Sequence, residues 1–177
     1  MAGAEKSLMH GWADRFDGLS AGLNRGVEFS LFTGGLTMAL VVAVQVFCRY
    51  VLNHSLFWSE EVARYLLIWI TFLGATVAYR RRSHPGIDLV SSRLAEGGRR
   101  LLRLLVELGG AAFFVVMLVW GWRFAWFVRF QVSPALGLSK GLVYAVVPLA
   151  GAIMLFHALA FLAAELAGGK ADGSSPG

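Results

Sequence analysis

Four long apolar segments constrain the fold of this chain more than any other feature. They cover residues 27–47, 62–79, 104–128 and 142–162, and the middle of each lacks Asp, Glu, Lys and Arg. A helix needs roughly 20 mostly apolar residues to cross the hydrocarbon core of a bilayer. Because hydrophobic residues make up 57% of the 177 residues and charged residues only 15%, the sequence predicts an all-α integral membrane protein with four transmembrane helices.

The basic residues predict the orientation of these spans. The link between residues 50 and 59 contains no Lys or Arg, whereas the link between the second and third spans contains Arg80, Arg81, Arg82, Arg93, Arg99, Arg100 and Arg103. The positive-inside rule therefore places the central link and both termini in the cytoplasm, an N-in/C-in arrangement. Arg129 and Lys140 in the last link oppose this assignment but are outnumbered. The net charge of +5 is explained by orientation rather than by nucleic-acid binding.

We expect three regions along the chain. Residues 1–26 form a cytoplasmic segment, 27–163 the membrane domain and 164–177 a flexible cytoplasmic tail. In the first region Trp12, Phe16, Leu19 and Leu23 are spaced as on one side of a helix. This segment is therefore either an interfacial helix or a disordered tail.

The central link is expected to contain a second interfacial helix. Ile87, Val90 and Leu94 would form its apolar side, and its arginines would face anionic headgroups. The Gly97-Gly98 pair is expected to break this helix before the third span begins.

The second span opens with the unusual sequence Trp58-Ser59-Glu60-Glu61. A tryptophan suits the membrane–water interface, and Ser59 is a favourable N-cap. Glu60 and Glu61 would then lie at the positive end of the helix dipole. Two carboxylates at the start of a span thus have a structural explanation.

Arg64 requires a partner because it begins to enter the apolar region. Glu60 and Glu61 lie four and three residues before it, which permits ion pairs along one helix. Arg49 closes the first span, and a bond from it to Glu61 across the hairpin is also plausible. Three interpretations remain open: an ion-pair cluster within the chain, a cluster that also meets a partner protein, and a solute or ion site.

Small residues recur at intervals of four in the first two spans. They are Gly35, Ala39 and Ala43 in the first, and Gly74 and Ala78 in the second. Such ridges allow helices to approach closely. They either pack within this bundle or contact another membrane subunit.

Nothing in the sequence has the pattern of a catalytic or cofactor site. Cys48 is the single cysteine, and His157 is the one histidine within a span. A bundle that binds haem through two histidines needs both at membrane depth. We therefore predict no cofactor and no enzymatic activity. A membrane-anchor subunit of a respiratory enzyme and an autonomous small carrier remain the alternatives, although the charge-free span centres argue against independent transport.

Several of these residues, taken in order, resemble a known family. The series comprises Arg49-Tyr50, then W58-S-E-E-V-A-R64, Trp69, F72-L-G-A75, His84 and Asp88, and later S133-P-A-L-G137 and Y144-A-V-V-P148. It is similar to the small membrane subunit of TRAP (tripartite ATP-independent periplasmic) transporters, and the similarity covers roughly residues 47–155.

The resemblance implies a function that composition does not. Such a subunit is a scaffold in the bacterial inner membrane that stabilises a large membrane subunit, which holds the substrate and sodium sites. A periplasmic binding protein docks transiently and delivers an organic acid. The implied structural or interface residues are Arg49, Trp58, Glu60, Glu61, Arg64, Trp69, Gly74, His84 and Asp88.

Overall fold

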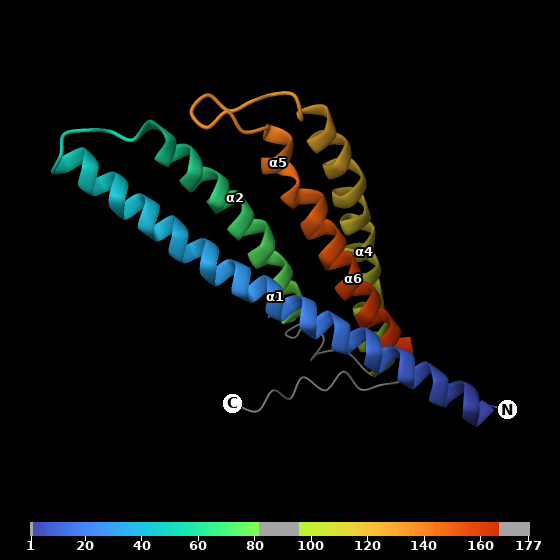
Figure 1. Ribbon diagram of the computed structural model, residues 1–177. Helices are drawn as coiled ribbons and strands as arrows, with labels where there is room; N and C mark the ends of the chain where they lie inside the picture. Colours follow the sequence, from blue (N-terminus) through green and yellow to red (C-terminus); the bar gives the residue numbers. More distant parts are fainter. Residues whose placement is uncertain (1, 82–95, 167–177) are drawn as a thin grey trace.

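The computed structural model describes residues 2–81 and 96–166, and helices dominate both ranges (Figure 1). The helices are α1 (Ala2–Tyr50), α2 (Phe57–Arg80), α4 (Glu96–Phe127), α5 (Lys140–Tyr144) and α6 (Val146–Leu166). The interfacial helix expected around residues 87–94 lies outside the described residues, as do His84, Asp88 and the tail from residue 167 onward.

Four helical segments are long and apolar enough to cross a membrane, which confirms the four predicted spans. They are Gly18–Tyr50, Phe57–Arg80, Leu104–Phe127 and Lys140–Ala163. The last of these combines α5 and α6. The direction in which they cross stays a prediction.

Helix α1 is longer than a bilayer requires. Its 49 residues correspond to about 74 Å, against a hydrocarbon core of about 30 Å. It runs obliquely across the other helices (Figure 1) and joins the expected N-terminal segment to the first span without a break. The break predicted at Gly97-Gly98 is absent, because α4 begins at Glu96 and continues through both glycines.

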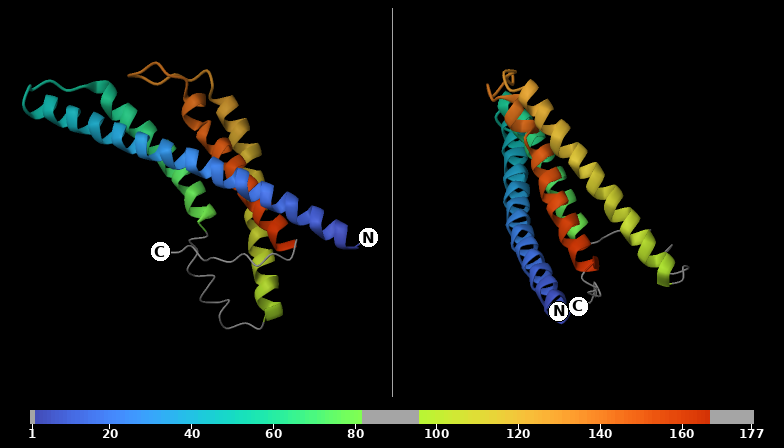
Figure 2. Two further views of the ribbon diagram at one scale, coloured as in Figure 1. Left: turned by 60° about the horizontal axis from the view of Figure 1, so that its bottom comes forward. Right: turned by 90° about the vertical axis from the view of Figure 1, so that its right-hand side faces the viewer.

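The helices form two hairpins that meet through α6. Helix α1 packs on α2, α4 packs on α5 and α6, and α6 also contacts both α1 and α2. Figure 2 shows α6 and α2 lying between α1 and α4. We call the end with the loops 51–56 and 128–139 the turn end, and the end with Arg80 and Arg81 the arginine end. Each of these loops connects the two helices of one hairpin, and both lie at the same end of the bundle (Figure 1).

The fourth span is divided into α5 and α6 by a proline. Pro148 has no N–H to donate to Tyr144, the residue four positions earlier, and regular α-helix is interrupted at Ala145. Pro148 is buried and packs against Gly121 of α4, where an added Cβ would lie 3.1 Å from the proline nitrogen. The interruption is therefore built into the contact between α4 and the fourth span.

Glycines allow α4 and the fourth span to approach closely. A Cβ at Gly141 would lie 2.7 Å from the carbonyl oxygen of Ala125, and one at Gly151 would lie 3.0 Å from the amide nitrogen of Leu118. Val146, Ala150 and Ala158 of α6 are fully buried. Helix α6 is thus the core of the bundle.

The small-residue ridges predicted on the first two spans are not packed within the chain. A Cβ added at Gly35 or at Gly74 meets no atom within 4 Å. Ala39, Ala43 and Ala78 are exposed. Packing inside this bundle was therefore the wrong alternative for these ridges.

Replacement of Gly141 by alanine tests the close approach. We expect Gly141→Ala to lower the free energy of unfolding by about 1–3 kcal/mol, because its new methyl group meets backbone atoms rather than a flexible side chain. Gly109→Ala on α4 is the matched control, since a Cβ there meets nothing within 4 Å. Thermal unfolding of the purified protein in detergent measures both. Equal melting temperatures would contradict the packing described here.

A carboxylate-bound loop at the turn end

The Glu61 carboxylate accepts three hydrogen bonds at the turn end. Tyr65, one helical turn further along α2, donates its hydroxyl to Oε1 at 2.8 Å. The backbone N–H groups of Ala135 and Leu136 donate to Oε2 at 3.0 and 2.9 Å. Glu61 therefore joins the start of α2 to the loop 128–139, more than seventy residues away in sequence.

The loop is also ordered by its own hydrogen bonds. Ser133 is 2% exposed and makes two hydrogen bonds with Leu138. The Ser133 N–H donates to the Leu138 carbonyl at 2.9 Å, and the Leu138 N–H donates to Ser133 Oγ at 3.2 Å. The turn requires Gly137, which has a φ of +65°. Lys140 N–H donates to the carbonyl of Gln131 at 2.8 Å, and Ser139 Oγ donates to the carbonyl of Arg129 at 2.5 Å. These bonds form a compact turn that offers the amides of residues 135 and 136 to Glu61.

The ion pairs expected around Arg64 are not formed. Arg49, Glu60 and Arg64 are exposed, and an ion pair forms instead at the opposite end, between Glu28 and Arg81. The Glu61 carboxylate is bound by two adjacent backbone N–H groups of the loop rather than by an arginine. Glu60 accepts a long hydrogen bond of 3.4 Å from the side chain of Gln45.

Ser59 does not cap α2. The N-cap residue is Leu56, which makes no side-chain cap. Ser59 is fully buried and donates its hydroxyl to the carbonyl of Leu56 at 2.6 Å. The sequence predicts that the Ser59 hydroxyl accepts a hydrogen bond from a backbone N–H of the first helical turn. The hydroxyl instead donates one to a backbone carbonyl.

The two tryptophans proposed from the sequence have different surroundings. Trp58 is 43% exposed, whereas Trp69 donates its indole N–H to the carbonyl of Val143 at 3.1 Å. Trp69 thus forms a second link between α2 and the fourth span, further from the loop than Glu61.

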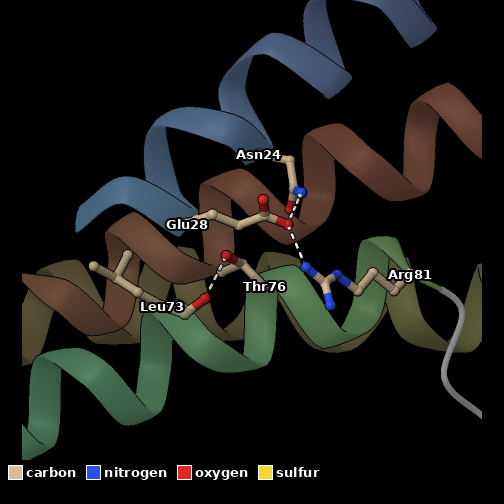
Figure 3. A network of polar contacts seen from close by, with 5 residues as sticks. All are labelled: Asn24, Glu28, Leu73, Thr76 and Arg81. Carbon is tan, nitrogen blue, oxygen red and sulfur yellow. Dashed lines mark hydrogen bonds and ion pairs between the residues drawn. The ribbon is translucent and has the colours of Figure 1, made fainter. Parts of the chain in front are cut away.

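Polar contacts also tie the helices together at the arginine end. Arg81 pairs with Glu28 at 2.8 Å, and Asn24 donates to the same oxygen of Glu28 at 2.8 Å (Figure 3). His157, fully buried on α6, shares a hydrogen bond of 2.6 Å with Ser20, and Arg80 donates to the Ser20 hydroxyl. His157 is therefore a packed residue within the bundle.

Glu107 of α4 accepts a hydrogen bond from within the bundle. Tyr79 of α2 donates its hydroxyl to Glu107 Oε2 at 2.5 Å and packs edge-on against Phe114 of α4, with ring centres 4.9 Å apart. This contact adds α4 to the elements joined at the arginine end.

The polar side chains described at the two ends form hydrogen bonds and an ion pair between structural elements. In the part of the chain that the structure describes, no three His, Cys, Asp or Glu side chains are grouped as metal ligands would be. The polar groups instead join helices that are distant in sequence. Between the two ends, the span centres carry no ionisable side chain.

Residues 38–168 match the family profile of the tripartite ATP-independent periplasmic transporters, DctQ component. The match covers well over half of the chain. The chain belongs to this family. TRAP small permeases are subunits of transporters rather than enzymes, and this one is a multi-pass protein of the inner membrane.

Individual relatives agree with this assignment. A putative TRAP transporter small permease protein of Haemophilus influenzae is 26% identical over 137 residues, which are 75% of this chain and 82% of that protein. The sialic acid TRAP transporter small permease protein SiaQ of Vibrio cholerae is 32% identical over 125 residues, 69% of this chain and 72% of SiaQ.

A longer relative bears on assembly. The isethionate TRAP transporter permease protein DctMQ of Oleidesulfovibrio alaskensis is 26% identical over 147 residues, 77% of this chain but only 23% of DctMQ. The counterpart of this small permease is there one part of a longer permease polypeptide. TRAP small permeases pair with large permease subunits.

Sequence reasoning found Glu61 but missed what it binds. Its partners are Tyr65 and two backbone amides, and a backbone amide has no signature in the sequence. The available signal was the turn S133-P-A-L-G137, whose proline and glycine indicate a tight turn with exposed N–H groups.

Removal of the Glu61 carboxylate should free the loop. In Glu61→Ala we expect the amides of Ala135 and Leu136 to exchange hydrogen about tenfold faster, because the bonds that protect them are lost. Glu60→Ala is the matched control, since Glu60 does not contact the loop. Hydrogen exchange read by mass spectrometry over residues 128–139 measures this. Unchanged hydrogen exchange in Glu61→Ala would show that the Glu61 carboxylate does not hold the loop.

Proposed function

We propose that this small permease is the scaffold subunit of its transporter, N-in/C-in, and stabilises the large permease during ion-coupled uptake of an organic acid. The observation that carries this proposal is the distribution of charge. Ionisable side chains of the described spans gather at the turn end and the arginine end, and the span centres between them are apolar. Transport of a charged solute relies on ionisable partners at membrane depth, and the centres of the four described spans carry no Asp, Glu, Lys or Arg.

The relatives support an organic acid as the cargo of the complex. Sialic acid and isethionate stand in the names of SiaQ and DctMQ, and both are organic anions. SiaQ and the matching part of DctMQ thus belong to transporters named for chemically different anions. This fits a subunit that does not select the cargo.

The exposed apolar surface supports a stabilising role. In the most apolar 18-residue window of α1 no residue is buried within the chain, compared with half of the window in the fourth span. Phe29, Phe32 and Leu36 of α1 are each more than half exposed. Such a helix completes its packing against lipid or against another membrane protein.

The turn end supports a further role in docking the periplasmic binding protein. Phe130 is 79% exposed and Val132 is 62% exposed, on a loop that its own bonds and Glu61 hold in place. Arg129 lies between two aromatic rings, with its guanidinium carbon 3.9 Å from the centre of Trp126 and 4.1 Å from that of Phe130. In the proposed orientation this apolar, preordered surface faces the periplasm, and preorganisation favours binding.

Co-expression with the large permease of the same transporter tests the scaffold role. We expect the two chains to purify together from detergent extracts, and uptake to be lost when the small chain is omitted, because the large permease then exposes an unpaired apolar face. Uptake is measured with both permeases and the binding protein in liposomes. A large permease that transports fully without the small chain would contradict the proposal.

Replacement of two exposed apolar side chains of the loop tests docking separately. We expect Phe130→Ser with Val132→Ser to raise the KM for loaded binding protein about five- to tenfold, with the two permeases still purifying together, because an exposed apolar contact is lost. Gln131→Ala, between the two positions, is the control. An unchanged KM would remove docking from the function of this loop.

A further inference from the structure

An apolar groove runs between the two hairpins at membrane depth. Its volume is about 640 Å³. Helices α1, α2 and α6 all contribute to its walls, among them Gly22, Gly26 and Ser30 of α1, Trp69 and Leu73 of α2, and Ile153 of α6. All of these residues belong to helices that are long and apolar enough to cross a membrane, which favours an occupant that also lies in the membrane.

On α1 the groove is lined by small residues spaced four apart, which are Gly22, Gly26, Ser30 and Gly34, together with Leu23, Val27 and Leu31. A Cβ added at Gly22 or at Gly26 meets no atom within 4 Å. The Ser30 hydroxyl donates to the carbonyl of Gly26 at 3.0 Å, so its donor is satisfied on its own helix. This wall therefore exposes helix backbone that nothing in the described chain covers.

The opposite walls are formed by large side chains. Val62, Leu66, Trp69 and Leu73 follow one side of α2. Leu66 and Trp69 line both this groove and a second hollow of about 240 Å³ that reaches Leu136 of the loop. The hollow surface thus extends along α2 from the arginine half of the bundle to the Glu61-bound loop. That length fits an extended membrane segment better than a compact solute.

We infer that this groove seats a transmembrane helix of the large permease, whose backbone approaches α1 at Gly22, Gly26 and Ser30. The inference rests on the proposed function. Small residues at intervals of four let two helices approach closely in a bilayer, and this approach creates the dispersion contacts that hold them together. In DctMQ the counterpart of this chain belongs to the same polypeptide as a larger permease region, so the occupant comes from a protein that remains beside the groove.

The ridge formed by Gly35, Ala39 and Ala43 is the competing surface on α1. Ala39 lies 13 residues after Gly26, which is about 220° around the helix. The two ridges therefore lie on opposite sides of α1. The groove is favoured because three helices surround it, whereas Gly35, Ala39 and Ala43 line neither hollow.

Substitutions at Gly26 and Ala39 distinguish the two surfaces. We expect Gly26→Leu to reduce the large permease that purifies with the small chain at least about tenfold, and Gly26→Ala to stay within about twofold, because only the larger side chain fills the groove. A Cβ at Gly26 meets nothing within 4 Å, and an unchanged melting temperature of the Gly26→Leu small chain alone shows that its fold is retained. Ala39→Leu is the control and should leave assembly unchanged. Loss of assembly in Ala39→Leu but not in Gly26→Leu would overturn the inference.

Photocrosslinking of the intact complex gives an independent reading. A photoreactive residue in place of Ser30 should join covalently to the large permease, whereas one in place of Ala39 should not. A phospholipid adduct alone at position 30, crosslinking from position 39 alone, or no adduct from position 30 would each refute the groove as the seat. If the unmodified chains fail to purify together, the scaffold proposal fails. If they purify together but position 30 does not reach the large permease, only the groove inference fails.

Discussion

Close approach between helices, rather than the hydrophobic effect, holds this fold together. Lipid tails are as apolar as leucine side chains, so helices in a bilayer associate through dispersion contacts and hydrogen bonds. Gly121, Gly141 and Gly151 bring the backbone of α4 and the fourth span within contact distance. Helix α6 can therefore touch every other described helix, and the two hairpins are joined through it. The other contacts of the chain depend on this arrangement.

Hydrogen bonds then fix the hairpins to each other at both ends. At the turn end Glu61 binds the amides of Ala135 and Leu136. At the arginine end Ser20, Arg80 and His157 join α1, α2 and α6. Polar groups near the membrane surface are less costly to desolvate than groups at its centre, so fastening at the ends leaves the middle apolar. The same distribution leaves the centres of the described spans without Asp, Glu, Lys or Arg.

The spans were predictable because hydropathy and length are local properties of the sequence. The hydrogen-bond partners of the polar residues were not predictable from the sequence. Glu61 and Arg64 are three residues apart, which made an ion pair between them the natural expectation. The carboxylate instead binds amides more than seventy residues away, and their position depends on the turn at Gly137 and on how the two hairpins meet. Ser59 shows the same limit, because an N-cap at Ser59 requires the helix to begin at Glu60, whereas α2 begins three residues earlier, at Phe57.

The small-residue ridges on α1 have no packing partner among the described helices of this chain at Gly22, Gly26 or Gly35. Small residues at intervals of four were recognisable in the sequence, yet they are not used between helices of this chain. The bundle is instead built on the glycines of α4, α5 and α6, where an added Cβ would collide with backbone. Glycines on α1 that meet nothing contribute no packing within the chain. Glycine also weakens a helix relative to alanine. The presence of glycines on this face of α1 is therefore better explained by a neighbour that approaches α1 closely than by the stability of the isolated chain.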